Sequence, residues 1–223
     1  MAARSSSLKT RSLKRAAVII VLAAVLGSAG MYVGRGPILR GLGSMLASDD
    51  PVAGSDAIVV TVDSGAAGIL EAADLIRAGI APRVAVFAGP PDAVSAEFLK
   101  RGIRYEDKTV TAVRLLKTLG VAEVERIATP VNGTEAEGRV LRGWCSERSY
   151  RSVVVVTTAD HARRVGRVLR REVAPPGDIR VLIRGSRYSE FDPERWWSTR
   201  DGVRIGIVEA EKLLLDFLRH PLS

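Results

Sequence analysis

The stretch SVVVVTTADHARRVGRVLRREV, residues 152–173, decides the fold. Its first seven residues form a continuous apolar and β-branched run, which is typical of a strand that helices cover on both faces of a parallel sheet. Residues 161–173 predict a helix, which the Pro-Pro-Gly at 175–177 ends. A strand that leads directly into a helix is half of a βαβ unit, so this stretch predicts an α/β fold.

The same alternation of short apolar runs and longer helical segments continues in both directions along the chain. We expect a Rossmann-like, three-layer α/β domain over residues 55–220, with a mostly parallel sheet of about five strands. The other expected strands are 56–62, 82–89, 124–131 and 178–185, and the other expected helices are 65–79, 105–119, 134–147 and 201–218.

The last of these helices, 201–218, contains apolar residues at helical spacing. A helix that packs on a domain normally buries its apolar stripe and leaves its polar side in water. We therefore expect the buried face of this helix to consist of Val203, Ile207, Leu214, Phe217 and Leu218.

Composition limits the kinds of protein this chain can be. Its 223 residues suit one domain, and 47% apolar residues exclude a disordered chain. The single cysteine, Cys145, excludes an internal disulfide framework and a multi-cysteine metal site. Only two histidines, His161 and His220, are present, so the sequence predicts no metal centre. It identifies no cofactor.

Charge is unevenly distributed along the chain. The net charge is +8, from 33 Lys and Arg against 25 Asp and Glu. Residues 1–15 contain five basic residues and no acid, so the remainder has 28 basic against 25 acidic residues. The high isoelectric point therefore comes mainly from a short tail, and nucleic acid is not a predicted partner.

A membrane is the first predicted partner. Residues 16–34, AAVIIVLAAVLGSAGMYVG, are 19 residues without a charge, long enough to cross a bilayer. The positive-inside rule places the basic tail 1–15 in the cytoplasm and the domain outside the plasma membrane, as a single-pass protein. Residues 35–54, rich in Gly and Pro, are expected to be a linker. Small residues at 27–30 leave open a cleaved signal peptide, but the full membrane length favours an anchor.

Small and polar residues follow each expected strand. In parallel sheets, ligands bind beyond the carboxyl ends of the strands, where helix N-termini attract anions. Helix caps and turns favour the same residue types, so part of this pattern has a structural explanation. The ligand-binding residues expected on this basis are Asp63, Ser64, Gly65, Gly89, Asn132, Gly133, Thr134, Thr157 and Thr158.

His161 is the candidate catalytic residue, because it follows the strongest strand and begins a helix. The helix N-terminus and the adjacent Arg163 and Arg164 disfavour an imidazolium, so we expect a neutral ring that acts as a general base or donates to an anion. His161 could instead only cap or pack the helix start. Arg164 is a candidate for binding phosphate or carboxylate. The sequence lacks a P-loop, a G-x-S-x-G elbow and a Gly-rich dinucleotide turn after the first strand.

Several segments, in order, resemble a bacterial envelope family of unknown function that contains the YdcF-, SanA- and ElyC-type proteins. They are DAIVV at 56–60, DLIRAGIAPRVAVFAG at 74–89, TAVRLLKTLGV at 111–121, VVVVTTADHARRVGRVLR at 153–170 and WWSTRDGVRIGIVEAEKLLLDFL at 196–218. The resemblance matches His161 and Arg164 to the family's H-x-x-R pattern, and Glu209 or Glu211 with Lys212 to its closing E-x-x-K. It implies a role in cell-envelope biogenesis.

The departures from that family all concern polar positions. A Gly-rich turn and a following Arg are missing after the first strand, Gly89 is followed by two prolines, and Thr134 to Glu137 lack the family's Asn.

Two hypotheses about function follow. In one, the domain binds an anionic, phosphate-bearing small molecule or carrier lipid and hydrolyses or transfers it, with His161 as acid–base and Arg164 stabilising charge. In the other, it is a non-catalytic ligand-sensing or partner-binding module. A nucleotide-dependent oxidoreductase is a weaker third.

Overall fold

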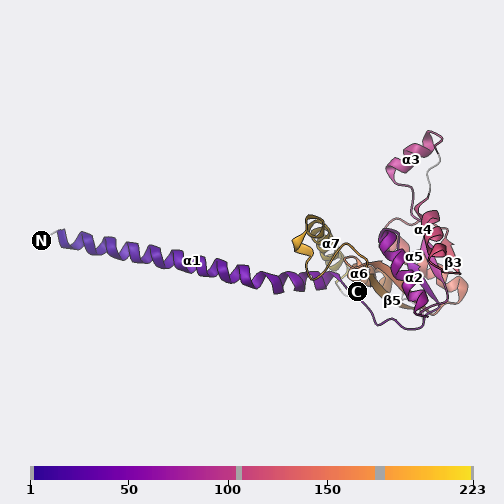
Figure 1. Ribbon diagram of the computed structural model, residues 1–223, viewed down its shortest axis with the longest axis horizontal. Coiled ribbons are helices and arrows are strands. Elements are labelled where there is room, and N and C mark those ends of the chain that lie inside the picture. The colour runs from indigo at the N-terminus through magenta and orange to yellow at the C-terminus, as the bar shows by residue number, and fades with distance from the viewer. Residues whose placement is uncertain (1–2, 104–106, 174–178, 222–223) are drawn as a thin grey trace. The chain divides into compact units, whose positions relative to one another are not determined.

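The computed structural model describes residues 3–103, 107–173 and 179–221. The chain forms two compact units that divide after Gly41. The described residues contain one helix long and apolar enough to cross a membrane, 28 residues from Ile19 to Leu46 within α1 (Ala3–Leu46; Figure 1). The helix therefore continues past residue 34, and the second unit begins inside the segment that we expected to be a linker.

The domain is built on a five-stranded sheet in which every strand pair is parallel. The predicted Rossmann-like α/β fold is confirmed. The strand order is β3-β2-β1-β4-β5. The chain adds β2 and β3 on one side of β1, and then returns to add β4 and β5 on the other side. β4 has the predicted bounds, whereas the other strands are shorter than predicted. The strands are β1 (Ala57–Val60), β2 (Val84–Phe87), β3 (Val124–Ile127), β4 (Ser152–Thr158) and β5 (Arg180–Ser186).

Helices cover both faces of the sheet and make three layers. Along β4, Val154 and Val156 pack against α2 (Gly65–Arg77) and α4 (Lys108–Thr118). Val153 and Val155 pack on the opposite face against α5 (Thr134–Arg148) and α6 (Ala162–Val173). Both faces of the strand are therefore buried, which explains why its sequence is a continuous apolar run.

A short helix, α3 (Ala93–Lys100), was not predicted. Asp92 begins it, because the Asp92 carboxylate accepts a hydrogen bond from the Ser95 N–H at 2.8 Å. The first strand is also shorter than expected, because the chain turns after Val60 into the 3-10 helix η1 (Val62–Ser64). The predicted start of the helix at 105–106 and the predicted stop at 175–177 lie outside the described residues.

The outer edge of β5 is covered by residues just after α1. The Asp50 N–H donates to the Ile183 carbonyl at 2.9 Å, and the Asp50 carboxylate accepts from the Ile183 N–H at 2.8 Å. The Asp49 carboxylate accepts from the Gly185 N–H at 2.7 Å. These contacts satisfy backbone groups that an edge strand would otherwise expose. Residues 49 and 50 are therefore part of the domain and not of a linker.

The predicted buried face of the last helix, α7 (Arg200–Arg219), is wrong. Ile207, Leu214, Phe217 and Leu218 are exposed, and Val203 is half-buried. The residues that α7 buries are instead small, acidic or a single leucine: Gly202, Gly206, Glu209, Leu213 and Asp216.

Two physical reasons explain this inverted face. The buried carboxylates are paired with α6: the Arg167 guanidinium donates to Asp216 at 2.7 Å, and Arg164 to Glu209 at 3.1 Å. The glycines allow close approach, since a Cβ at Gly206 would lie 2.7 Å from the Trp196 ring, beside η2 (Trp196–Ser198). Hydrophobic periodicity alone does not reveal ion pairs with another helix.

Candidate functional site

The strand order reverses between β1 and β4, and this reversal positions the candidate site. The chain leaves β1 toward α2 on one face of the sheet and leaves β4 toward α6 on the other. Loops that separate in this way leave a crevice beyond the strand ends, where open α/β sheets bind ligands. The loops here are η1, after β1, and residues 159–161, after β4.

His161 follows β4 at this edge of the sheet and contacts a buried carboxylate from α7. Its Nδ1 is 2.6 Å from Glu209 Oε2 and 3.6 Å from Asp160 Oδ2. The Glu209 side chain is 3% exposed, against 15% for His161. A ring held through Nδ1 presents Nε2 as the atom for proton transfer, as in catalytic histidines that a carboxylate orients. The predicted neutral state of His161 rested on its neighbours in sequence and stays a prediction.

Arg164 links three helices at the same place. Its Nε donates to Glu209 Oε2 at 3.1 Å, and its Nη1 donates to the Thr134 hydroxyl at 3.1 Å, at the start of α5. Lys212 adds a second cation, with Nζ 2.7 Å from Glu209 Oε1. His161, Arg164 and Thr134, which we predicted separately, therefore form one connected group. Arg163 is different: its guanidinium donates to the Ala47 carbonyl at 3.4 Å, at the surface.

Two acidic groups in the site have pKa values shifted in opposite directions. Burial raises the pKa of Glu209, but the hydrogen bond and charge of His161, with Lys212 and Arg164, outweigh it and leave the pKa at about 2. Burial raises the pKa of Glu137 to about 7. The hydrogen bond from the Val62 N–H lowers this pKa, whereas the charge of Asp63 raises it. That N–H donates to Glu137 Oε1 at 2.9 Å. Near pH 7, the Glu209 carboxyl is ionised. Glu137 is close to its pKa and is present in both its protonated and its ionised form.

Buried hydroxyls without partners lie at the ends of β1 and β4. Among the described residues, Oγ1 of Thr61, Thr157 and Thr158 has no hydrogen-bond partner, and Thr61 and Thr157 are 4% and 1% exposed. Side chains alternate along strands, so Thr61 and Thr157 face α5 and α6, as Val59 and Val155 do. Leaving a buried polar group unpaired costs about 1–3 kcal/mol. Such hydroxyls are suited to a polar ligand or a bound water.

The first and third strand ends supply helix N-termini. Gly65 begins α2 with φ of 53°, and Gly133 precedes α5 with φ of 86°; a side chain would strain both positions. Neither helix has a side-chain cap, so its first N–H groups remain available to an anion. Asn132, before Gly133, is exposed.

The remaining predicted residues have smaller roles. Ser64 is buried, and its hydroxyl donates to the Thr61 carbonyl at 2.7 Å, so it supports the turn. Asp63 is exposed and acts on the site through its charge on Glu137. Gly89 lies beside η1, because a Cβ there would be 2.9 Å from the Val62 side chain.

A metal ion is a second possible reading of this cluster. Asp160, His161 and Glu209 each offer a ligand atom, and these atoms lie within 4.8 Å of one another. However, His161 Nδ1 and Glu209 Oε2 already contact each other at 2.6 Å. Arg164 and Lys212 also pair with that carboxylate, and their positive charge opposes a cation. The geometry therefore favours an acid–base group over a metal centre.

Sequence reasoning missed Glu137 and Thr61 as site residues and left Glu209 unresolved. The E-x-x-K pattern offered Glu209 or Glu211, and the structure shows that Glu209 is buried while Glu211 is exposed. Glu137 follows Thr134 by three residues, which is a helix-capping spacing, but its carboxylate reaches the Val62 N–H instead. No signal in the sequence identified Thr61.

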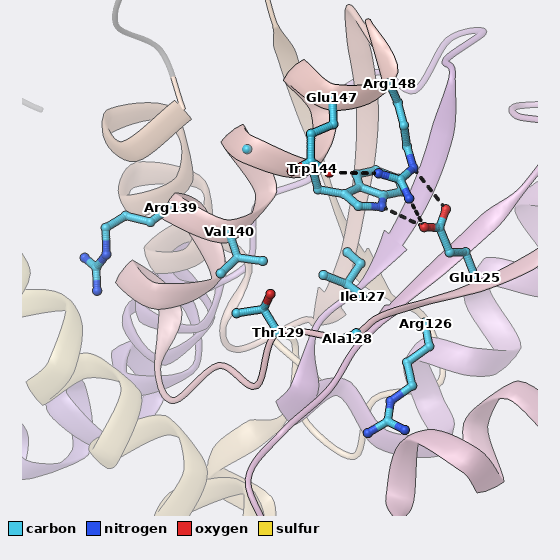
Figure 2. Close-up of a pocket in the computed structure, with 11 residues that line it drawn as sticks. Glu125, Arg126, Ile127, Ala128, Thr129, Arg139, Val140, Trp144, Glu147 and Arg148 are labelled. Carbon is cyan, nitrogen blue, oxygen red and sulfur yellow. Dashed lines mark hydrogen bonds and ion pairs between the residues drawn. The ribbon is translucent and has the colours of Figure 1, made fainter.

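A groove of about 410 Å³ lies elsewhere, between β3 and α5, and contains none of the predicted site residues. Figure 2 shows Trp144 and Arg148 directed toward Glu125, with Arg126 and Arg139 on opposite sides of the groove. The Trp144 Nε1 and Arg148 Nε each donate to the Glu125 carboxylate at 3.2 Å. Arg126 pairs with Asp107. These charged groups are paired within the protein. We therefore interpret the groove as a structural contact between β3 and α5.

Comparison with known proteins identifies no family for this chain. No family model and no curated protein matches the chain. Among solved structures, a universal stress protein in complex with cAMP is similar, with 20% sequence identity and a TM-score of 0.33. The match covers 59% of this chain and 97% of that one. The α/β fold with its parallel sheet is established by the strand pairing itself.

Proposed function

We propose that this protein is a membrane-anchored domain that binds an anionic, phosphate-bearing ligand at the β1/β4 crevice and hydrolyses or transfers its phosphate group. The apolar helix within α1 supplies the anchor, and the basic tail before it favours a cytoplasmic N-terminus and an extracytoplasmic domain. The resemblance to the YdcF-type proteins supports a role in cell-envelope biogenesis. The ligand class includes soluble sugar phosphates and carrier lipids.

One observation carries this proposal: Glu209, His161, Arg164 and Thr134 form a connected group at the strand-order reversal. Arg164 supplies a fixed positive charge on a rigid helix. The uncapped N-termini of α2 and α5 and the unpartnered hydroxyls of nearby strand ends add donors for phosphate oxygens.

The chemistry follows from the acid–base groups. In hydrolysis, a water oxygen forms a bond to phosphorus while the bond from phosphorus to the leaving oxygen breaks, and that oxygen takes a proton. The attacking water loses a proton in the same step; His161 Nε2 receives that proton or delivers the one that the leaving oxygen takes, while Glu209 holds the ring through Nδ1. Arg164 stabilises the charge that develops on the phosphate oxygens. Opposite pKa shifts of neighbouring groups, as in Glu137 and Glu209, are typical of acid–base sites.

A non-catalytic binding module is the second candidate, and a specific observation favours it. Ser64, which follows β1, is buried and donates its hydroxyl to the Thr61 carbonyl, so it is not activated as a nucleophile. Arg164 already bonds Glu209 and Thr134. A site of this kind can recognise a phosphate group without transforming it.

The test is a thermal-shift measurement on the full-length protein in detergent. The probes are inorganic pyrophosphate, nucleotides, sugar phosphates and a polyprenyl phosphate. A ligand at one hundred times its Kd stabilises the native state by about 2.7 kcal/mol, which raises Tm measurably. Arg164→Gln should abolish the rise, whereas the matched variant Arg163→Gln, on the same helix but at the surface, should keep it.

The outcomes separate the two candidates. Release of phosphate from the bound probe, reduced about 10²–10⁴-fold by His161→Ala, supports catalysis. A thermal shift without release supports the binding module. No shift with any probe, or an equal loss in both arginine variants, contradicts the proposed ligand site.

A further inference from the structure

The outward face of α7 is apolar along much of the helix. Ile207, Leu214 and Leu218 are 58%, 59% and 70% exposed, and their spacing of seven and four residues places them on one side. Single exposed apolar residues are ordinary, but a continuous stripe marks an interaction surface. The other exposed apolar side chains of α7 are Val208, Leu215 and Phe217.

The inner face of α7 contacts the point where the chain enters the domain. Leu46 packs with Phe191 and Leu213 in a small apolar cluster, with Trp196 beside them. Gly43 lies so close to the segment before η2 that a Cβ would be 2.2 Å from the Pro193 carbonyl oxygen. Gly43 and Leu46 belong to the same compact unit as α7, so α7 packs on the first residues of the domain.

Distances along the chain fit a helix that lies on the bilayer surface. The 12 residues from Gly34, the end of the uncharged stretch, to Leu46 rise about 18 Å in a helix. Because Leu46 packs with Leu213 on the inner face of α7, so short a tether allows α7 to reach the headgroup layer.

The charges of α7 also suit a lipid surface. Arg200, Arg204 and Arg219 are exposed, against the exposed acids Asp201 and Glu211. Arg204 pairs with Asp201 at 3.4 Å, but both side chains are more than two-thirds exposed, so this pair is weak. Arginines beside an apolar stripe are the pattern of helices that lie in the membrane interface.

We propose that α7 lies in the headgroup layer of the membrane, with Ile207, Leu214 and Leu218 directed toward the acyl chains. This rests on the membrane anchoring in the proposed function, but not on the ligand or the reaction. A second copy of the chain could also cover this face. The short tether between the uncharged stretch and Leu46, together with the exposed arginines of α7, favours the bilayer.

The experiment uses the full-length protein in vesicles of phosphatidylcholine and phosphatidylglycerol. Cys145 is buried and is replaced by Ala; a single spin label is then placed at Leu214→Cys or Leu218→Cys. The matched control is Lys117→Cys on α4, an exposed position on the opposite side of the sheet. Collision with oxygen, which concentrates in lipid, is compared with collision with a water-soluble nickel chelate. Resistance to alkaline carbonate extraction tests the anchor separately.

Each outcome supports or contradicts the proposal. We expect labels at 214 and 218 to favour oxygen, with nickel collisions several-fold rarer than at 117. Labels shielded from both reagents, with spin–spin broadening, indicate a second copy and contradict the proposal. Labels open to nickel contradict it as well. If the carbonate step extracts the protein, the anchor itself is wrong, which distinguishes that failure from a failure of α7 docking.

Discussion

Two glutamates in this domain pair with arginines in different surroundings. Glu209 is 3% exposed in the crevice and contacts His161, Arg164 and Lys212. Glu125 is 35% exposed in the groove beside α5 and contacts Arg148 and the Trp144 ring nitrogen. Both are hydrogen-bonded, yet water reaches the Glu125 carboxylate and is largely excluded from the Glu209 carboxylate, although its partner Lys212 is 48% exposed. Burial, more than the number of contacts, therefore decides what each carboxylate contributes.

Removing the carboxylates should give the largest difference between these regions. Glu209→Ala leaves three basic groups around a buried position, and breaking a buried pair by removing one partner costs about 3–5 kcal/mol. Glu125→Ala should cost about 1 kcal/mol or less, because its pair is partly solvated. The measurement is urea unfolding of both variants at pH 7. Equal losses would show that burial does not distinguish the two sites.

The second prediction concerns the pH dependence of the buried site. The folded-state pKa of Glu137 is raised from 4.5 to about 7, so the native state binds more protons than the unfolded state between these values. Stability should therefore fall as pH rises from about 4.5 to 7, by about 3 kcal/mol over the full window. Urea unfolding at several pH values measures this fall.

Glu137→Gln is the control for that prediction, because its amide approximates the protonated carboxyl and does not titrate. It should flatten the stability profile between pH 5 and 7. Glu209, whose pKa is lowered to about 2, contributes stability that is present above about 4.5 and lost as pH falls below it. An unchanged profile in Glu137→Gln would assign the pH dependence to another group.

The smallest expected changes in stability come from substituting one glycine in each of the two regions. A Cβ at Gly206 on α7 would lie 2.7 Å from the Trp196 ring, so Gly206→Ala should destabilise by about 1–3 kcal/mol. A Cβ at Gly143 on α5, at the groove, would meet nothing within 4 Å. Gly143→Ala should therefore stabilise by about 0.5–1 kcal/mol through helix propensity. Thermal unfolding should shift in opposite directions for the two variants.

The sheet could be predicted from the sequence because its signal is local. The apolar run of β4 required burial on both faces, and its predicted bounds are confirmed. The position of His161 and Arg164 after that strand also followed from chain order. α3 was missed because it is only eight residues long and follows two prolines.

Contacts between distant segments could not be predicted in the same way. Glu209 is 45 residues from Arg164 in sequence, and its acidic character gave no indication of burial. The buried side of α7 depends on arginines of α6, so hydrophobic periodicity selected the wrong face of the helix. Thr61 is buried because β1 pairs with β4 at this point, and this pairing joins segments that are far apart in the sequence.

The covered edge of β5 bears on how the domain can be produced apart from its membrane helix. Asp49 and Asp50 occupy the N–H groups of Gly185 and Ile183, which would otherwise template pairing with another chain. A shortened protein that begins after residue 50 would expose this edge and should form intermolecular sheet. One that begins near residue 42 retains both aspartates and should remain dispersed in solution.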